Sequence, residues 1–180
     1  VTSTSSRVDN RAAWCADSNP EDWTGLGAGS YDITEMRGPG TRAFSWGEGG
    51  VLASTDELWA VQPGGNHTFT FTPISREHGI PFGNAACGNA EAIYWLGRDR
   101  MIWRWAGAQP EPIGLPIQRT LRSALTQSVQ SARLGYDDYN HQLVLLYASV
   151  DNVVKGFTYS LDNQVWMPQH FNFPSTATLP

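Results

Sequence analysis

The chain has 180 residues, of which 41% are hydrophobic, 12% aromatic and only 16% charged. This length supports a domain of moderate size with a real core, and eight tryptophans, seven phenylalanines and six tyrosines supply large side chains for it. A formal net charge of -5 and the lack of a basic tract disfavour a protein that captures nucleic acid by charge.

The N-terminal part of the chain predicts an entry segment and a partial sheet. Residues 1–10 are polar and rich in serine and threonine, which indicates a flexible segment. Short apolar stretches at residues 11–17 and 30–36 predict strands, with a turn-forming sequence between them. We interpret residues 11–36 as a partial blade. Because the chain begins at Val1 rather than methionine, we expect it to be a piece of a longer polypeptide.

Residues 42–75 alternate apolar stretches with turns, which predicts a four-stranded antiparallel blade. In the last of these strands, Phe69 and Phe71 alternate with threonines, and this period of two predicts one buried and one exposed face. Asp56 and Glu57 are interpreted as a polar turn between two strands of the same blade.

Residues 82–113 repeat the scheme and contain an aromatic hairpin, two apolar runs joined by a Gly-Arg-Asp-Arg turn. Trp95, Trp103 and Trp105 are interpreted as packing between adjacent sheets, because burying each ring stabilises the fold by roughly 2 to 3 kcal/mol. The alternative is that these rings stack on sugars.

A helix is predicted over residues 116–130, where Pro116 suits the first turn and Leu121 and Leu125 belong to one apolar stripe. We expect this helix to be a spacer packed on the edge of a blade. Residues 131–171 then predict a last group of four strands.

These units repeat at intervals of about 41 and 51 residues, close to the spacing of propeller blades. The predicted fold class is therefore all-β. Antiparallel four-stranded blades would form a partial or small β-propeller with one short helix, and residues 11–180 would make a single propeller-like domain.

The sequence predicts no catalytic, cofactor-binding or metal-binding site. Asp137 and Asp138 are adjacent in a predicted turn, where aspartate is favoured because it bonds its own backbone. No histidine pair has metal-ligand spacing, which leaves surface or hydrogen-bonded roles for these residues. The four histidines are His67, His78, His141 and His170.

The cysteines and the arginines both have plain structural interpretations. Cys15 and Cys87 lie far apart without a metal-binding pattern, and we favour small buried side chains over a disulfide. All basic residues except Lys155 are arginines, which suits pairing with a carboxylate inside the fold or packing on tryptophan. No apolar run approaches the roughly 20 residues needed to span a bilayer.

Three segments form an ordered series that resembles a known family: RAAWCADSNPEDWT, then FTPISREHGIPFGNAACGNAEAIYWLGRDRMIWRWAG, then EPIGLPIQRTL. They resemble the β-propeller tail structural proteins of short-tailed bacteriophages, of the tail nozzle or packaged-DNA stabilisation type. The resemblance covers roughly residues 7–171.

The resemblance implies a non-enzymatic virion component without cofactors. It would be a ring subunit around the DNA exit channel, below the portal and adaptor, found in the virion tail and in the host cytoplasm during assembly. The implied partners are other copies of the chain, the portal or adaptor, other tail proteins, and packaged DNA that passes without specific binding.

The tip of the aromatic hairpin, Arg98, Asp99 and Arg100, is the expected contact with a neighbouring subunit or adaptor, the alternative being a solvated turn. A second hypothesis for the whole chain is a carbohydrate-binding or glycan-cleaving propeller of a phage tail. That hypothesis predicts largely exposed rings for the tryptophans of the hairpin.

Overall fold

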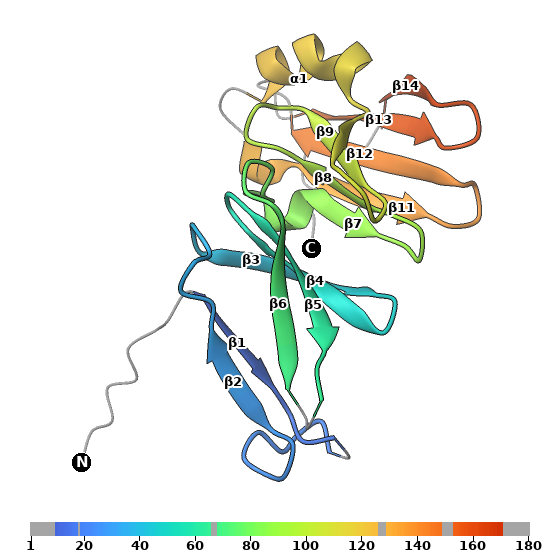
Figure 1. The fold of residues 1–180 in the computed structure, drawn as a ribbon. Helices are drawn as coiled ribbons and strands as arrows, with labels where there is room; N and C mark the ends of the chain where they lie inside the picture. The colour runs from blue at the N-terminus through green and yellow to red at the C-terminus, as the bar shows by residue number, and fades with distance from the viewer. Residues whose placement is uncertain (1–9, 18, 66–67, 126–128, 149–152, 171–180) are drawn as a thin grey trace. The chain divides into compact units, whose positions relative to one another are not determined.

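The computed structural model describes residues 10–17, 19–65, 68–125, 129–148 and 153–170 (Figure 1). The described residues form 14 strands, one short α-helix and three 3-10 turns, and every pair of neighbouring strands is antiparallel. The predicted all-β class is confirmed, whereas the propeller arrangement stays a prediction. The predicted flexible segment lies almost wholly outside the described residues.

The chain divides into two compact units, residues 1–79 and residues 80–180. Each unit is described by itself. The prediction that residues 11–180 make one propeller-like domain stays a prediction.

The first unit begins with a two-stranded hairpin, β1 (Arg11–Trp14) and β2 (Gly29–Asp32). Arg11 faces Asp32 across the pair, and its Nε lies 2.6 Å from Asp32 Oδ1. In the connection, Asp22 Oδ1 accepts a hydrogen bond of 2.8 Å from the backbone N–H of Gly25. The hairpin is thus closed at one end by an ion pair, while a side-chain turn orders its loop.

The first unit also contains a four-stranded sheet whose strands are neighbours in chain order. Its strands are β3 (Gly40–Trp46), β4 (Gly49–Ser54), β5 (Leu58–Pro63) and β6 (Phe69–Ser75). As the alternation predicted, Phe69 and Phe71 are half-buried while Thr70 and Thr72 are exposed.

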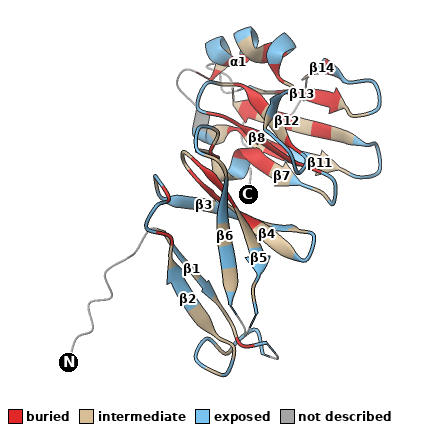
Figure 2. Ribbon diagram, in the orientation of Figure 1, coloured by how far each residue is buried: buried red, intermediate tan, exposed pale blue. Residues whose placement is uncertain are grey.

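Aromatic contacts attach the hairpin to β6. The rings of Trp14 and Phe69 meet edge to face with centroids 5.0 Å apart, and those of Tyr31 and Phe71 stack at 5.1 Å. Since neither β1 nor β2 carries a buried residue (Figure 2), these ring pairs provide much of the hairpin's tertiary attachment.

Asp56 and Glu57 lie in the turn between β4 and β5, as predicted, but the side chain of Glu57 is fully buried, which the sequence did not indicate. Glu57 Oε1 accepts a hydrogen bond of 2.6 Å from Arg37 Nε, and Oε2 accepts one of 2.9 Å from Trp59 Nε1. Burial alone would raise the pKa of Glu57, but these hydrogen bonds outweigh it and hold the pKa below its usual value. Arg76 lies over the Trp59 ring, 5.3 Å from its centroid. The predicted roles for arginine are confirmed at these two positions.

The second unit contains two four-stranded sheets, both with strands in chain order. The first comprises β7 (Ala86–Gly88), β8 (Ile93–Leu96), β9 (Ile102–Trp105) and β10 (Glu111–Pro112). The second comprises β11 (Arg133–Asp137), β12 (Gln142–Ala148), β13 (Val154–Ser160) and β14 (Val165–His170). The first strand of the second sheet, β11, contacts β7 and β8.

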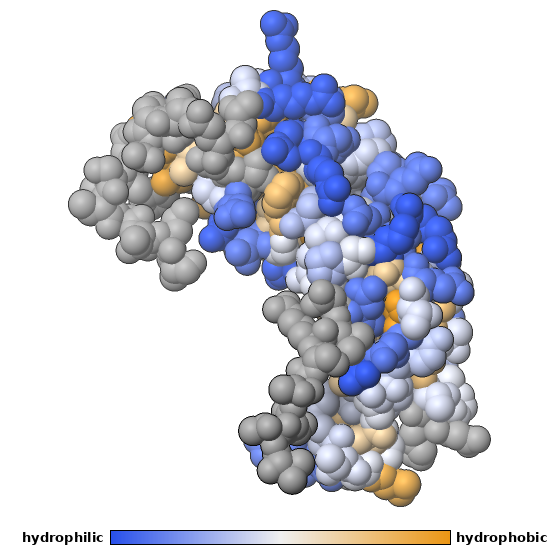
Figure 3. Space-filling view, turned by 90° about the vertical axis from the view of Figure 1, so that its left-hand side faces the viewer, coloured by the Kyte–Doolittle hydropathy of each residue, from blue (hydrophilic) through white to orange (hydrophobic). Residues whose placement is uncertain are grey.

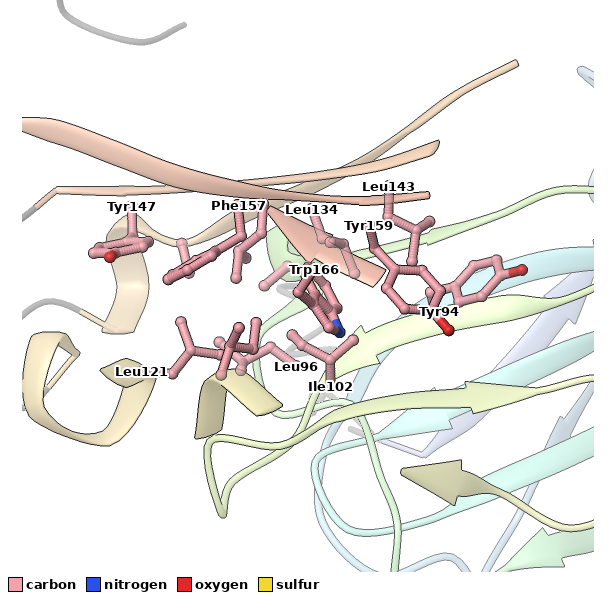
Figure 4. Packing of buried hydrophobic residues seen from close by; sticks show 14 of the residues in the cluster. Tyr94, Leu96, Ile102, Leu121, Leu134, Leu143, Tyr147, Phe157, Tyr159 and Trp166 are labelled. Carbon is pink, nitrogen blue, oxygen red and sulfur yellow. The ribbon is translucent and has the colours of Figure 1, made fainter. Parts of the chain in front are cut away.

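The two sheets enclose the largest core of this unit (Figure 4). Leu96 and Ile102 come from one sheet, and Leu143 and Leu145 from the other, and all four are fully buried. Trp166 packs beside them, where its Nε1 donates a hydrogen bond of 2.8 Å to the carbonyl oxygen of Ile113. This indole therefore joins β14 to the segment that follows β10.

The helix is shorter than the sequence predicted. It runs over α1 (Gln118–Ala124), preceded by the 3-10 turn η2 (Leu115–Ile117). Residues 126–128 lie outside the described residues, and Val129–Ser131 form a separate 3-10 turn, η3. Leu121 and Leu125 are fully buried in the core between the sheets, so the helix covers that core rather than only an edge.

Candidate binding cleft

A cleft of about 470 Å³ lies within the second unit and is the candidate functional site. Its floor is built from β8, β9 and β10 on one side and from β11 and β13 on the other. Its mouth is formed by three hairpin turns, those between β7 and β8, between β11 and β12, and between β13 and β14. The cleft volume falls in the range of ligand sites, which span about 300–1,000 Å³.

One wall of the cleft is a row of three polar side chains on adjacent strands. Arg104 on β9 is in register with Tyr94 on β8 and with Glu111 on β10. Its NH1 donates a hydrogen bond of 2.6 Å to Glu111 Oε1. Burial would lower the pKa of Arg104, but the Tyr94 hydroxyl and the Glu111 carboxylate outweigh it and raise this pKa. Arg104 is thus a fixed cation whose charge is already matched by Glu111.

The opposite wall contains Tyr159 on β13, in register with Trp166 on β14. Tyr159 is 7% exposed, and its ring packs against that of Trp166 with centroids 4.9 Å apart. No described residue hydrogen-bonds to the Tyr159 hydroxyl, although this side chain lines the cleft. Figure 4 shows the Tyr159 and Tyr94 hydroxyls at the same end of the core. The Tyr159 hydroxyl is therefore open to the cleft, where it can hydrogen-bond to a ligand.

Side-chain hydrogen bonds to the backbone order the turns at the mouth. Asn89 Oδ1 accepts a hydrogen bond of 2.8 Å from the backbone N–H of Ala92. Asp137 Oδ1 accepts hydrogen bonds from the backbone N–H groups of Tyr139 and Asn140, at 3.1 and 3.2 Å. Hydrogen bonds from Asn140, from its side chain above all, lower the pKa of Asp137. The turn role predicted for Asp137 is confirmed.

The charge of the cleft is unbalanced. Glu111 is matched by Arg104, but three further carboxylates line the cleft, those of Glu91, Asp138 and Asp162. His141 Nδ1 lies 3.9 Å from Asp162 Oδ1, and both side chains are more than half exposed. This arrangement suits binding of a ligand that donates hydrogen bonds or carries positive charge.

The predicted contact residues lie outside this cleft. Arg98, Asp99 and Arg100 form the β8–β9 turn, where Arg100 adopts a left-handed backbone with φ of 62°. Arg98 and Asp99 are exposed, and the guanidinium of Arg100 lies 5.5 Å from the ring centroid of Phe82. Their role as a contact stays a prediction.

Asp99 also has an internal role in the turn. Its Oδ1 accepts a hydrogen bond of 3.1 Å from the backbone N–H of Met101, and its carbonyl oxygen accepts one of 3.2 Å from Arg122 Nε. The backbone of this turn is therefore held against α1.

The hairpin tryptophans do not form an exposed platform. Trp95 and Trp105 are 0% and 4% exposed, and Trp103 is half-buried with Nε1 3.4 Å from Asp99 Oδ1. Burial is the outcome that the packing interpretation predicted.

Other chemistry-bearing residues are dispersed. Cys15 and Cys87 are not disulfide-bonded, as the interpretation favoured, and both are half-buried rather than fully buried. His67 and the side chain of His170 lie outside the described residues. Within the part of the chain that the structure describes, no group of three or more His, Cys, Asp or Glu side chains is placed to hold a metal ion.

Sequence reasoning did not find the cleft. Tyr94, Arg104 and Glu111 are separated along the chain and meet only through strand register, while Tyr159 comes from the other sheet. The available signal was the polar or acidic residues at three separate hairpin turns, and each turn has an adequate local explanation.

A scan against known protein families finds no match, and a search of curated proteins finds no relative. None of the described helices has the length and apolar character required to cross a membrane.

Proposed function

We propose that the chain is a non-enzymatic structural component of a phage or phage-like tail. It would act as a ring subunit around the DNA exit channel, below the portal or adaptor. The observation that best supports this proposal is the pair of face-to-face four-stranded sheets in residues 80–180, with first strands β7 and β11 in contact. Sheets in chain order that pack face to face are typical of neighbouring propeller blades.

The second face of the β11–β14 sheet also suits a stacked arrangement. Alternation along β12 and β14 places Val144, Leu146, Val165 and Met167 on the face opposite the core. Val165 and Met167 are 51% and 42% exposed. A sheet that faces solvent on one side normally carries polar residues there, so these apolar side chains favour a position between two other layers.

The charge of the chain fits passage of DNA rather than capture. The formal net charge of -5 would repel phosphates, so DNA would slide past without specific binding. On the face drawn in Figure 3, hydrophilic residues predominate among those coloured, and hydrophobic residues occur as separate spots. The proposed partners are other copies of the chain and neighbouring tail proteins.

The decisive test locates the protein in particles. Immunogold labelling of particles from the phage that encodes the chain should place it at the connection between head and tail, and native mass spectrometry should give a closed homo-oligomer. Absence of the chain from purified particles would overturn the proposal.

The carbohydrate-binding or glycan-cleaving alternative has less support. It predicted largely exposed rings at Trp95, Trp103 and Trp105, and two of these are buried while the third is half-buried. A stable monomer that binds glycans would nevertheless favour it over a tail component.

A further inference from the structure

We propose that the cleft of the second unit is a guanidinium-binding site, and that its occupant is an arginine from a second copy of this chain. Copies would then associate head to tail. The binding chemistry is argued from residues of the second unit alone and does not depend on the proposed function. Only the idea that this association closes a ring in a tail rests on the proposed function.

The cleft is lined by more carboxylates than basic side chains, since four carboxylates stand against Arg104 and His141. Arg104 is held by Glu111, which leaves the carboxylates of Glu91, Asp138 and Asp162 around the opening. The Tyr159 hydroxyl, on a side chain 7% exposed, has no hydrogen-bond partner among the described residues. A guanidinium presents five N–H donors in a fixed plane and can bond to a hydroxyl and carboxylates together.

The same unit carries an arginine-rich end. We define the arginine end as Arg98 and Arg100 in the β8–β9 turn together with Arg119 and Arg122 on α1. Arg98, Arg119 and Arg122 are exposed. Because Arg122 donates a hydrogen bond to the Asp99 carbonyl oxygen, the turn and the helix hold these charges together.

Topology keeps the arginine end away from the cleft of its own chain. The turn that carries Glu91 precedes β8, and the turn that carries Arg98 follows it, so they lie at opposite ends of that strand. Four strand residues separate the two turns by about 13 Å. A positive end and a negative end on one molecule pair between copies, and such a contact makes rings or filaments.

The guanidinium chemistry is tested with a small probe. We expect N-acetyl-arginine amide to perturb the NMR signals of cleft residues, whereas its uncharged isostere N-acetyl-citrulline amide does not. Tyr159→Phe removes only the unpartnered hydroxyl and should weaken binding about tenfold. Tyr147→Phe is the matched control, because Tyr147 is 3% exposed in the same core but does not line the cleft. Equal binding of both probes, binding of neutral saccharides instead, or equal effects of the two Phe variants would overturn the proposal.

Self-association is tested with two charge-reversed chains. One chain carries Arg98→Glu and Arg119→Glu, and the other carries Asp138→Arg and Asp162→Arg, all at exposed positions. Each variant alone should be monomeric where the parent associates, and circular dichroism checks that each is folded. An equimolar mixture should give dimers, because each variant keeps one intact end.

The outcomes separate this inference from the proposed function. If both variants associate like the parent, or if the mixture stays monomeric, head-to-tail pairing is wrong even for a chain found in tails. If the mixture dimerises but the chain is absent from particles, the pairing stands and the tail role falls.

Discussion

Arg37 Nε lies 2.6 Å from Oε1 of Glu57, so an arginine that is 62% exposed neutralises a carboxylate that is fully buried. The same carboxylate accepts the indole N–H of Trp59. We expect Glu57→Ala to lower the free energy of unfolding by about 2–3 kcal/mol, because it leaves the buried indole N–H without an acceptor and releases Arg37. Glu77→Ala, at an exposed position nearby, should cost less than about 0.5 kcal/mol in the same urea titration. Equal losses would show that the buried ion pair contributes nothing.

Gly79 should not tolerate a side chain. A Cβ at this position would meet the backbone of Asp56 and Glu57, which cannot move without distorting the turn before β5. We expect Gly79→Ala to destabilise the first unit by about 3 kcal/mol. Gly65→Ala is the control, because a Cβ there has open space. Thermal unfolding followed by tryptophan fluorescence compares the two variants, and a Gly79→Ala protein as stable as the Gly65→Ala protein contradicts the prediction.

Trp166 should be one of the most sensitive positions of the second unit. Trp166→Ala removes a 9% exposed indole, its ring contacts and its hydrogen bond to Ile113, and we expect a loss of about 4 kcal/mol. Met167→Ala, on the other face of the same strand and 42% exposed, should cost less than about 1 kcal/mol. Urea unfolding of both variants checks this order, and the reverse order would mean that the core between the sheets is not the main source of stability.

Acid should destabilise the first unit before the second. Hydrogen bonds lower the folded-state pKa values of Asp22, Asp32 and Glu57 in the first unit, and that of Asp137 in the second. A carboxyl group with a lowered pKa contributes stability above its unfolded pKa of about 4, and this is lost as the pH falls through the folded value. Hydrogen exchange measured between neutral pH and about pH 3 should show earlier loss of protection in β1–β6. Earlier loss in β11–β14 would be inconsistent with this assignment.

Alkali should destabilise the second unit before the first. Burial raises the pKa values of Tyr94, Tyr147 and Tyr159, all in the second unit, above the ordinary value of 10.0. A raised tyrosine pKa contributes stability that is complete below the unfolded pKa and is lost as the pH rises through the folded value. The part of the tyrosinate absorbance that comes from these three residues should therefore appear together with unfolding of the second unit. Titration of all tyrosines near their ordinary pKa in a protein that stays folded would contradict it.

Local rules predicted much of the fold because the strands pair with their chain neighbours. The Phe69 and Phe71 alternation and the Asp137 turn depend on residues close in sequence, and both appear in the structure as predicted. The turn at Glu57 was predicted, but the burial of its carboxylate was not, because that burial depends on Arg37, 20 positions away. The predicted helix was too long because an apolar stripe does not mark the residue at which a short helix ends.

The candidate cleft lay beyond such rules for a related reason. The placement of Tyr94 and Glu111 on either side of Arg104 can be predicted only when the register of β8, β9 and β10 is known. The free Tyr159 hydroxyl depends further on how two sheets pack. In sequence, Tyr159 is simply an aromatic residue in a strand.

Strand pairing between chain neighbours also has a consequence for biosynthesis. Each four-stranded sheet closes through hairpins alone, so its pairing can begin once its own strands have left the ribosome. The core between the two later sheets cannot be completed until Trp166 has been synthesised. A nascent chain that ends before β14 would lack one strand of this core and would leave Leu143 and Leu145 incompletely covered. Chaperones bind hydrophobic surface that is exposed in this way.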